Sequence, residues 1–295
     1  MGGAPAVRRP RRQEERHRPG GRALRARADD GPQDDRDRDR AWVTKPHEDP
    51  IDESKRIAEA AKRKKVGLKL LGGAGIHAHS PSAHKAPLKR KYGDLDYATS
   101  KKDRKAVVEL FRELGYEPNE RFNLMNGDRR LYFYDPHNGR QVDIFIDVFR
   151  MSHDIDLRGR LEHDHPAVSP SDLLLSKLQI YEVNRKDLVD VAALMLDHTI
   201  EARNHEDAIE AAYIARLAAA DWGMYRTLQV NIERLRAMLE ELEIDRELVK
   251  ARLDELWSAI DSEPKPFKWR VRAQVGDRVR WYELPEETRS PYQPE

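Results

Sequence analysis

The chain carries two aspartates one residue apart, Asp94 and Asp96, in the segment Tyr92-Gly93-Asp94-Leu95-Asp96-Tyr97. Successive side chains of a β-strand point to opposite faces, so both carboxylates are expected on one face and Leu95 in the core. Two carboxylates at such a short distance raise each other's pKa unless a cation lies between them. Because carboxylate oxygens suit Mg²⁺, the pair predicts a magnesium site. The alternative is that both carboxylates lie on a solvated strand face.

A pair of glycines, Gly72 and Gly73, lies upstream of these aspartates. The segment 66–71 before the glycines is typical of a short strand, and 74–79 after them is typical of the first turns of a helix. Backbone N–H groups at a helix start favour an anion, because the helix dipole acts in the same direction. The glycines are therefore candidates for a phosphate-binding turn.

A third carboxylate is expected from the segment 140–149, in which apolar residues alternate with other types. This alternation predicts a strand with Asp143 and Asp147 on one face. At ~3.3 Å per residue the two lie about 13 Å apart, so only one of them can join Asp94 and Asp96. The alternative is an edge strand with a solvated face.

The order of Gly-Gly, Asp-x-Asp and a strand-borne Asp resembles the nucleotidyltransferase superfamily, whose members share a polymerase-β-like core. The closest branch is that of the AbiEii-type toxins and minimal nucleotidyltransferases. The resemblance runs from about Gly67 to His198. It includes a second block, 169–178 followed by 185–190, which looks like the branch's helical Lys and Lys-Asp-x-x-Asp segments. Two departures are that Gly73 replaces the usual Ser and that the stretch from Gly73 to Asp94 is longer than in many members.

The resemblance implies two Mg²⁺ ions, with Mn²⁺ as an alternative, bound by Asp94 and Asp96. It also implies a nucleoside triphosphate near Gly72 and Gly73. The Val-Asp-Ile segment around Asp143 resembles the family's apolar-acid-apolar segment, so Asp143 is the expected third ligand and Asp147 a secondary candidate. Arg90 and Lys177 are expected to assist as cations. Asp187 and Asp190 are secondary candidates, which could position Lys177 or Arg185.

The implied activity is metal-dependent transfer of a nucleoside monophosphate from a triphosphate to a hydroxyl. The acceptor stays open among tRNA, a protein and a small molecule. One biological role is that of a toxin–antitoxin component with an antitoxin protein as partner. The alternative function is a non-catalytic module of the same fold that binds RNA or a protein partner.

Composition sets outer limits on the function. The 295 residues are 36% charged and 39% hydrophobic, with a net charge of +1, so any attraction to polyanions must be local. The absence of cysteine excludes disulfides and thiolate chemistry and fits a reducing cytoplasm. No apolar run approaches the ~20 residues that a membrane helix needs, so no membrane partner is expected.

We expect an α+β fold in which a mixed β-sheet with helices on one side is followed by a C-terminal helical domain. Four segments are predicted: a disordered Arg/Asp-rich tail over 1–45, a nucleotidyltransferase-like core over 46–166, a helical domain over 167–262, and a basic aromatic hairpin and tail over 263–295. Helical spacing predicts helices over 51–65, 101–114, 171–181, 185–198, 206–220, 225–242 and 246–261.

Two hairpins are expected. Strands over 129–134 and 140–149 flank Asn138-Gly139, a strong hairpin signal. In the tail, 268–272 and 278–282 flank Gly276-Asp277, and arginines alternate with aromatic residues. Those aromatic residues either pack on the body of the protein or, together with the arginines, contact nucleic acid.

Overall fold

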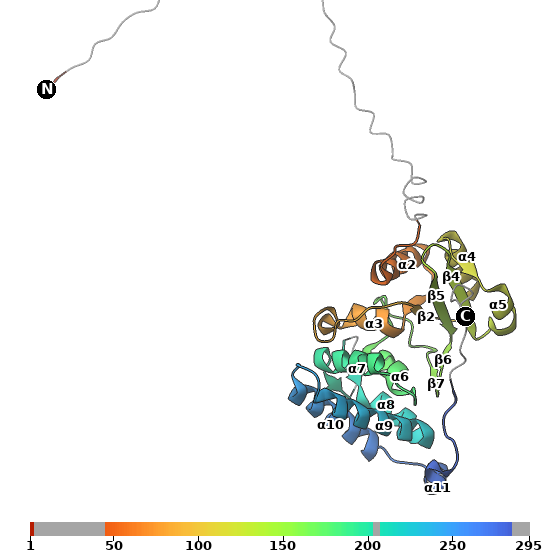
Figure 1. The fold of residues 1–295 in the computed structure, drawn as a ribbon, viewed down its shortest axis with the longest axis vertical. Coiled ribbons are helices and arrows are strands. Elements are labelled where there is room, and N and C mark those ends of the chain that lie inside the picture. Colours follow the sequence, from red (N-terminus) through yellow and green to blue (C-terminus); the bar gives the residue numbers. More distant parts are fainter. Residues whose placement is uncertain (3–44, 203–206, 285–295) are drawn as a thin grey trace, which may run out of the picture. The chain divides into compact units, whose positions relative to one another are not determined.

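The computed structural model of the protein describes residues 1–2, 45–202 and 207–284. The disordered tail expected over 1–45 falls almost wholly outside the described residues, as does 285–295. From Lys45 onward the described residues combine a mixed sheet with a C-terminal helical region (Figure 1). The expected α+β class is confirmed at this level.

A five-stranded sheet carries the aspartates. Its strands lie in the order β1-β2-β5-β4-β3. Their bounds are Leu68–Leu70 (β1), Leu95–Thr99 (β2), Glu117–Pro118 (β3), Arg130–Asp135 (β4) and Arg140–Ile146 (β5). Strands β2 and β5 are parallel, and the other neighbours are antiparallel. The hairpin predicted at Asn138-Gly139 is confirmed by the pairing of β4 with β5, and Gly139 has a φ of 66°.

Two helices, α2 (Pro50–Lys64) and α4 (Arg104–Glu113), pack on one face of this sheet. Leu95 and Tyr97 of β2 point toward these helices, where they share a core with Ile57 of α2 and Phe111 of α4. Because strand side chains alternate, Asp96 points to the opposite face. Burial of the apolar side chains therefore fixes the direction of the acidic one.

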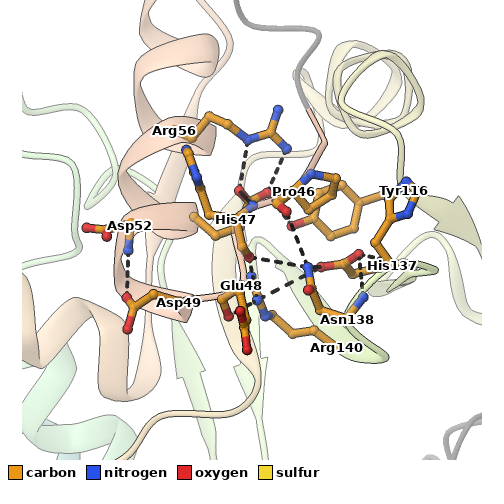
Figure 2. Close-up of polar contacts among 12 residues, drawn as sticks. Pro46, His47, Glu48, Asp49, Asp52, Arg56, Tyr116, His137, Asn138 and Arg140 are labelled. Atoms are coloured by element: carbon orange, nitrogen blue, oxygen red, sulfur yellow. Dashed lines mark hydrogen bonds and ion pairs between the residues drawn. The ribbon is translucent and has the colours of Figure 1, made fainter.

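The segment 46–49 is held against the turn between β4 and β5 (Figure 2). Arg140 donates through Nη2 to the backbone carbonyls of His47 and Glu48, each at 2.7 Å. The carboxylate of Asp49 then caps α2 by accepting hydrogen bonds from two backbone N–H groups in its first turn. The hairpin turn and α2 thus fix each other's position.

The strand expected over 140–149 is broken at Asp147, and that prediction is wrong at this point. Asp147 has a φ of 61°, in the left-handed region, so the strand cannot continue through it. Residues after it form β6 (Val148–Arg150), which pairs with β7 (Asp154–Asp156) in a separate two-stranded sheet. Lys101 donates its backbone N–H to Asp147 Oδ1 at 3.0 Å, which turns this side chain toward the loop after β2.

The second half of the described chain is mostly helical. Its main helices are α6 (Pro170–Leu178), α7 (Arg185–Asp197), α8 (Ala211–Ala220), α9 (Trp222–Leu239) and α10 (Arg246–Ser262), and they gather together below the sheet in Figure 1. A short parallel pair, β8 (Ile200–Glu201) and β9 (Ile209–Glu210), lies between α7 and α8. Leu228, Ile232 and Leu235 are buried in the shared core, which confirms the predicted helical stripe. Among the described helices, none has the length and apolar character needed to span a bilayer.

The hairpin predicted over 268–282 is wrong. The segment forms helix α11 (Phe267–Val275) followed by a 3-10 turn, η2 (Gly276–Arg278). Helical spacing lets Trp269 and Arg272 reach the same surface: Trp269 Nε1 donates to the Ala218 carbonyl at 3.0 Å, and the Arg272 guanidinium lies 4.3 Å from the Trp222 ring centroid. The alternating sequence pattern could not reveal these packing partners.

The aromatic residues that follow α11 also pack on the helical region. Trp281 Nε1 donates to the Thr227 hydroxyl at 3.1 Å, and Tyr282 stacks on Tyr181 with 4.0 Å between ring centroids. The predicted docking of tail aromatics is therefore confirmed for these residues. Phe267 is the exception, because 74% of it is exposed.

Candidate functional site

Two carboxylates are paired across the parallel strands β2 and β5, and a third lies just before β2. The parallel register sets Asp96 directly opposite Asp143. Asp94 lies two residues before Asp96, immediately ahead of β2, so the chain brings it to the same edge. Asp94 is exposed, Asp96 is half-buried and Asp143 is buried. The juxtaposition predicted from the sequence is therefore present in the fold.

Burial raises the pKa of each of these carboxyl groups. Loss of hydration is the main cause that raises the pKa of Asp96 to about 7, and the neighbouring Asp143 and Asp94 add to it, while Lys177 and Arg130 act in the opposite direction. Loss of hydration likewise raises the pKa of Asp143 and of Asp94. The site therefore holds negative charge at a cost that an added cation would relieve.

Asp143 already has a cationic partner. Arg130, on the neighbouring strand β4, donates through Nε to Asp143 Oδ1 at 2.7 Å. Within residues 45–202 and 207–284, no three or more His, Cys, Asp or Glu side chains are grouped as a ready metal site. The oxygen chemistry of Asp94 and Asp96 still fits a hard divalent cation, since carboxylates are ligands that Mg²⁺ prefers.

The two glycines stand where any side chain would collide with the site. A Cβ on Gly72 would lie 2.1 Å from Asp96 Oδ2, and the φ of Gly72 is +57°. A Cβ on Gly73 would lie 2.2 Å from Arg90 Nη2 and 2.7 Å from a ring carbon of Tyr92. Helix α3 (Gly72–His79) thus starts against the Asp96 carboxylate, and it includes the two glycines that the sequence predicted as a turn before the helix. Arg90 occupies the space over Gly73.

The predicted assisting residues form one ion-pair network. Arg90 makes a bidentate contact with Asp190, from Nε at 2.7 Å and from Nη2 at 2.6 Å. Lys177 Nζ lies 2.6 Å from Asp187 Oδ1 and 3.2 Å from Asp190 Oδ2. Burial by itself lowers the pKa of Lys177, but the carboxylates of Asp190 and Asp187 outweigh it, so the pKa is raised and the ammonium stays charged.

This network adjoins the carboxylate cluster. The positive charge of Lys177 lowers the pKa of Asp96, against the larger effect of burial. Arg90 lies against Gly73, the residue next to Gly72 and so next to the Asp96 carboxylate. The structure therefore brings the predicted cations and the predicted acids together around the start of α3.

Asp147 does not join this cluster. Its carboxylate accepts from the backbone of Lys101 and it lines a separate cavity beside β1. Strand β5 ends before Asp147, which has a left-handed backbone. Only Asp143 therefore lies in the part of the segment 140–149 that pairs with Asp96, and this geometry favours Asp143 over Asp147.

Sequence reasoning missed two residues of the site. Arg130 could have been found from the hairpin, because the turn fixes the register of β4 on β5 and sets Arg130 diagonally across from Asp143. Tyr92 lies under the Arg90 guanidinium at 4.3 Å, and among the described residues no partner accepts or donates at its buried hydroxyl. No signal in the sequence distinguished Tyr92 from other loop tyrosines.

No protein-family model matches the chain, and no curated protein is significantly similar to it.

Proposed function

We propose that the protein is a metal-dependent nucleotidyltransferase that moves a nucleoside monophosphate from a nucleoside triphosphate to a hydroxyl acceptor. One observation carries the proposal: parallel strands set Asp143 opposite Asp96, with Asp94 beside them and Gly72 in contact with Asp96. A carboxylate cluster next to the glycine-rich start of a helix is an arrangement that suits a cation and a phosphate group.

Each residue has a definite task in this proposal. Asp94 and Asp96 hold Mg²⁺, and Asp143 is the third carboxylate that Arg130 orients from β4. A metal ion held by these residues would neutralise charge on the phosphates and would lower the pKa of the acceptor hydroxyl. Gly72 leaves room for the Asp96 carboxylate, because a Cβ at this position would lie 2.1 Å from Asp96 Oδ2.

The cationic residues act on the triphosphate. Lys177 is buried and kept charged by Asp187 and Asp190, so it offers a positive charge that is already fixed in position. Arg90 is held by two hydrogen bonds to Asp190 and lies over Gly73, where it lines the approach to the helix start. Asp187 and Asp190 therefore serve as positioning residues for Lys177 and Arg90.

The test is to incubate the protein with Mg²⁺, total RNA and cell lysate, and with each α-³²P-labelled nucleoside triphosphate in turn. Stable label on one acceptor class is expected, and γ-³²P-labelled triphosphate should leave the acceptor unlabelled because pyrophosphate departs. Label from the γ position would contradict the proposal. Metal-dependent triphosphate binding without transfer would also contradict it and would favour a non-catalytic binding module.

A further inference from the structure

A groove runs along the outer edge of β1, away from the carboxylate cluster. Its cavity of about 780 Å³ lies between α2, β1, the loop 157–166 and the side of α3 that carries Ala74, His77 and Ala78. The floor and walls include apolar side chains, among them Ala58, Leu68, Leu70, Ala74, Leu157 and Leu161. Grooves of this size accept peptides or small molecules, so the nature of the lining decides between them.

The lining includes the outer edge of β1, which the segment 166–168 pairs at Leu70 but leaves open at Leu68. Leu70 donates its N–H to the Pro166 carbonyl at 2.8 Å and accepts from the Val168 N–H at 3.0 Å, so its peptide groups face away from β2. The peptide groups of Leu68, two residues earlier, must face the same edge. Over residues 45–202 and 207–284, no backbone group bonds to Leu68 from that side. An extended chain can therefore add there as a further strand.

The two walls of the groove differ in charge. Helix α2 packs on the face of the sheet to which Leu68 points, and it contributes Lys55 and Lys62 to the groove, with Lys65 just beyond the helix and Glu59 as the one acid of this wall. The excess charge on the α2 wall is therefore positive.

The opposite wall is formed by the loop 157–166. It lies on the face to which Lys69 points, because Lys69 Nζ donates to the carbonyls of His163 and His165. Lys102 neutralises Glu162 at 3.2 Å, and Arg158 is paired with Asp156 at the rim. After the Lys69 ammonium on this wall is counted, Asp164 of the loop and Asp147 at the end of β5 still leave a small excess of negative charge.

We propose that this groove binds an extended peptide segment of a partner protein, which pairs with Leu68, the part of the β1 edge that the segment 166–168 leaves open. Side chains of an added strand point alternately to the two walls. Charge complementarity then selects a segment with acidic and apolar residues toward α2 and basic residues toward the loop 157–166. Backbone hydrogen bonds to Leu68 provide the affinity, and the two charged walls provide the specificity.

The test uses the full-length protein and a fluorescently labelled synthetic peptide in which Glu and Val alternate with Lys. Saturable binding is expected by fluorescence anisotropy. A peptide of the same composition with its Glu and Lys residues in separate blocks should bind at least tenfold more weakly. The peptide with proline at its central position should also bind weakly, because proline lacks an N–H for the ladder.

Variants of α2 test the location. Ala58→Trp fills the groove and should weaken peptide binding at least tenfold, whereas Arg63→Trp, on α2 but outside the groove, should leave it unchanged. Lys62→Glu reverses one charge of the α2 wall at an exposed position, so it should weaken binding without affecting folding if Ala58→Trp fails to fold. Hydrogen exchange of the Leu68 amide should slow in the presence of the peptide.

Three outcomes would overturn the proposal. The first is peptide binding that neither Ala58→Trp nor Lys62→Glu weakens, and the second is unchanged exchange of the Leu68 amide at saturating peptide. The third is self-association that Ala58→Trp abolishes, which would identify a second copy of the chain as the occupant. None of these outcomes depends on the nucleotidyltransferase proposal, since binding needs neither metal nor triphosphate.

Discussion

Asp96 and Asp143 face each other across two parallel strands that are far apart in the sequence. A parallel pair requires a crossover connection, and the 40 or so residues between the two strands contain α4, β3, α5 (Glu120–Asn126) and β4. The fold therefore brings two carboxylates together at a cost in repulsion and lost hydration. A repulsive pair of acids destabilises the folded state, and such pairs occur where a cation or a reaction needs them.

The first prediction concerns stability against pH. The folded state keeps a proton on Asp96 up to about pH 7, whereas in the unfolded chain the carboxyl ionises near the ordinary aspartate pKa of 3.8. The unfolded state thus loses its proton first, and the contribution of Asp96 to the free energy of unfolding falls as pH rises from 4 to 7. The Asp96→Asn variant should lack this decline and gain on the order of 1 to 3 kcal/mol at pH 7 relative to wild type. Urea denaturation of both proteins from pH 4 to 8 measures it, and parallel curves would reject the raised pKa.

A second prediction tests the contact between Gly72 and Asp96. Gly72→Ala introduces a methyl group 2.1 Å from the carboxylate at a φ of +57°, so it should cost roughly 1 to 3 kcal/mol and abolish nucleotide transfer. Gly93→Ala is the matched control, because nothing lies within 4 Å of its Cβ position. That variant should stay within ~0.5 kcal/mol of wild type. Equal effects of the two substitutions on transfer would show that Gly72 has no special role.

The third prediction separates the two aspartates of the segment 140–149. Asp143→Asn should abolish transfer, since Asp143 faces Asp96. Asp147→Asn should leave the rate of transfer within about twofold of wild type, because Asp147 lies in the cavity beside β1. Initial rates at saturating triphosphate provide the comparison. Loss of transfer in Asp147→Asn with full activity in Asp143→Asn would reverse the assignment.

A fourth prediction concerns the docking of α11. Trp269→Ala removes a ring that packs edge-on against Tyr225, with 5.1 Å between centroids, and donates to Ala218, so it should lower the free energy of unfolding by about 2 kcal/mol. Phe267→Ala, two residues away and largely exposed, should change it by less than ~0.5 kcal/mol. Thermal melts of both variants decide the matter. A fully stable Trp269→Ala would mean that α11 contributes no packing energy.

Much of the fold followed from local patterns. Apolar residues at helical spacing predicted α7, α9 and α10 to within a few residues, because each helix buries one continuous stripe. The Asn138-Gly139 turn predicted the β4–β5 hairpin, since its backbone twist matches that of the strands. The sequence also indicated the acids of the site, because alternation assigns Asp94, Asp96 and Asp143 to definite strand faces.

Other features depend on tertiary contacts that no local pattern reveals. Asp147 has a left-handed backbone because the chain leaves the sheet there, although the alternation of residue types continues unbroken. The tail forms α11 because helical spacing lets Trp269 and Arg272 reach the helical region together, although its sequence alternates like a strand. In the same way, the pairing of Arg90 with Asp190 joins residues a hundred positions apart.

The central claim is that Asp96 belongs to a metal-dependent centre of nucleotide transfer. Its most direct test is the rate of label transfer from α-³²P-labelled triphosphate to the acceptor, measured for wild type with Mg²⁺, wild type with excess EDTA, and Asp96→Asn with Mg²⁺. We predict transfer in the first reaction only, with at least a hundredfold lower rate in the other two, because removing either the ion or its ligand leaves the phosphate charge unneutralised. Transfer by Asp96→Asn at the wild-type rate, or transfer that persists in EDTA, would contradict the account.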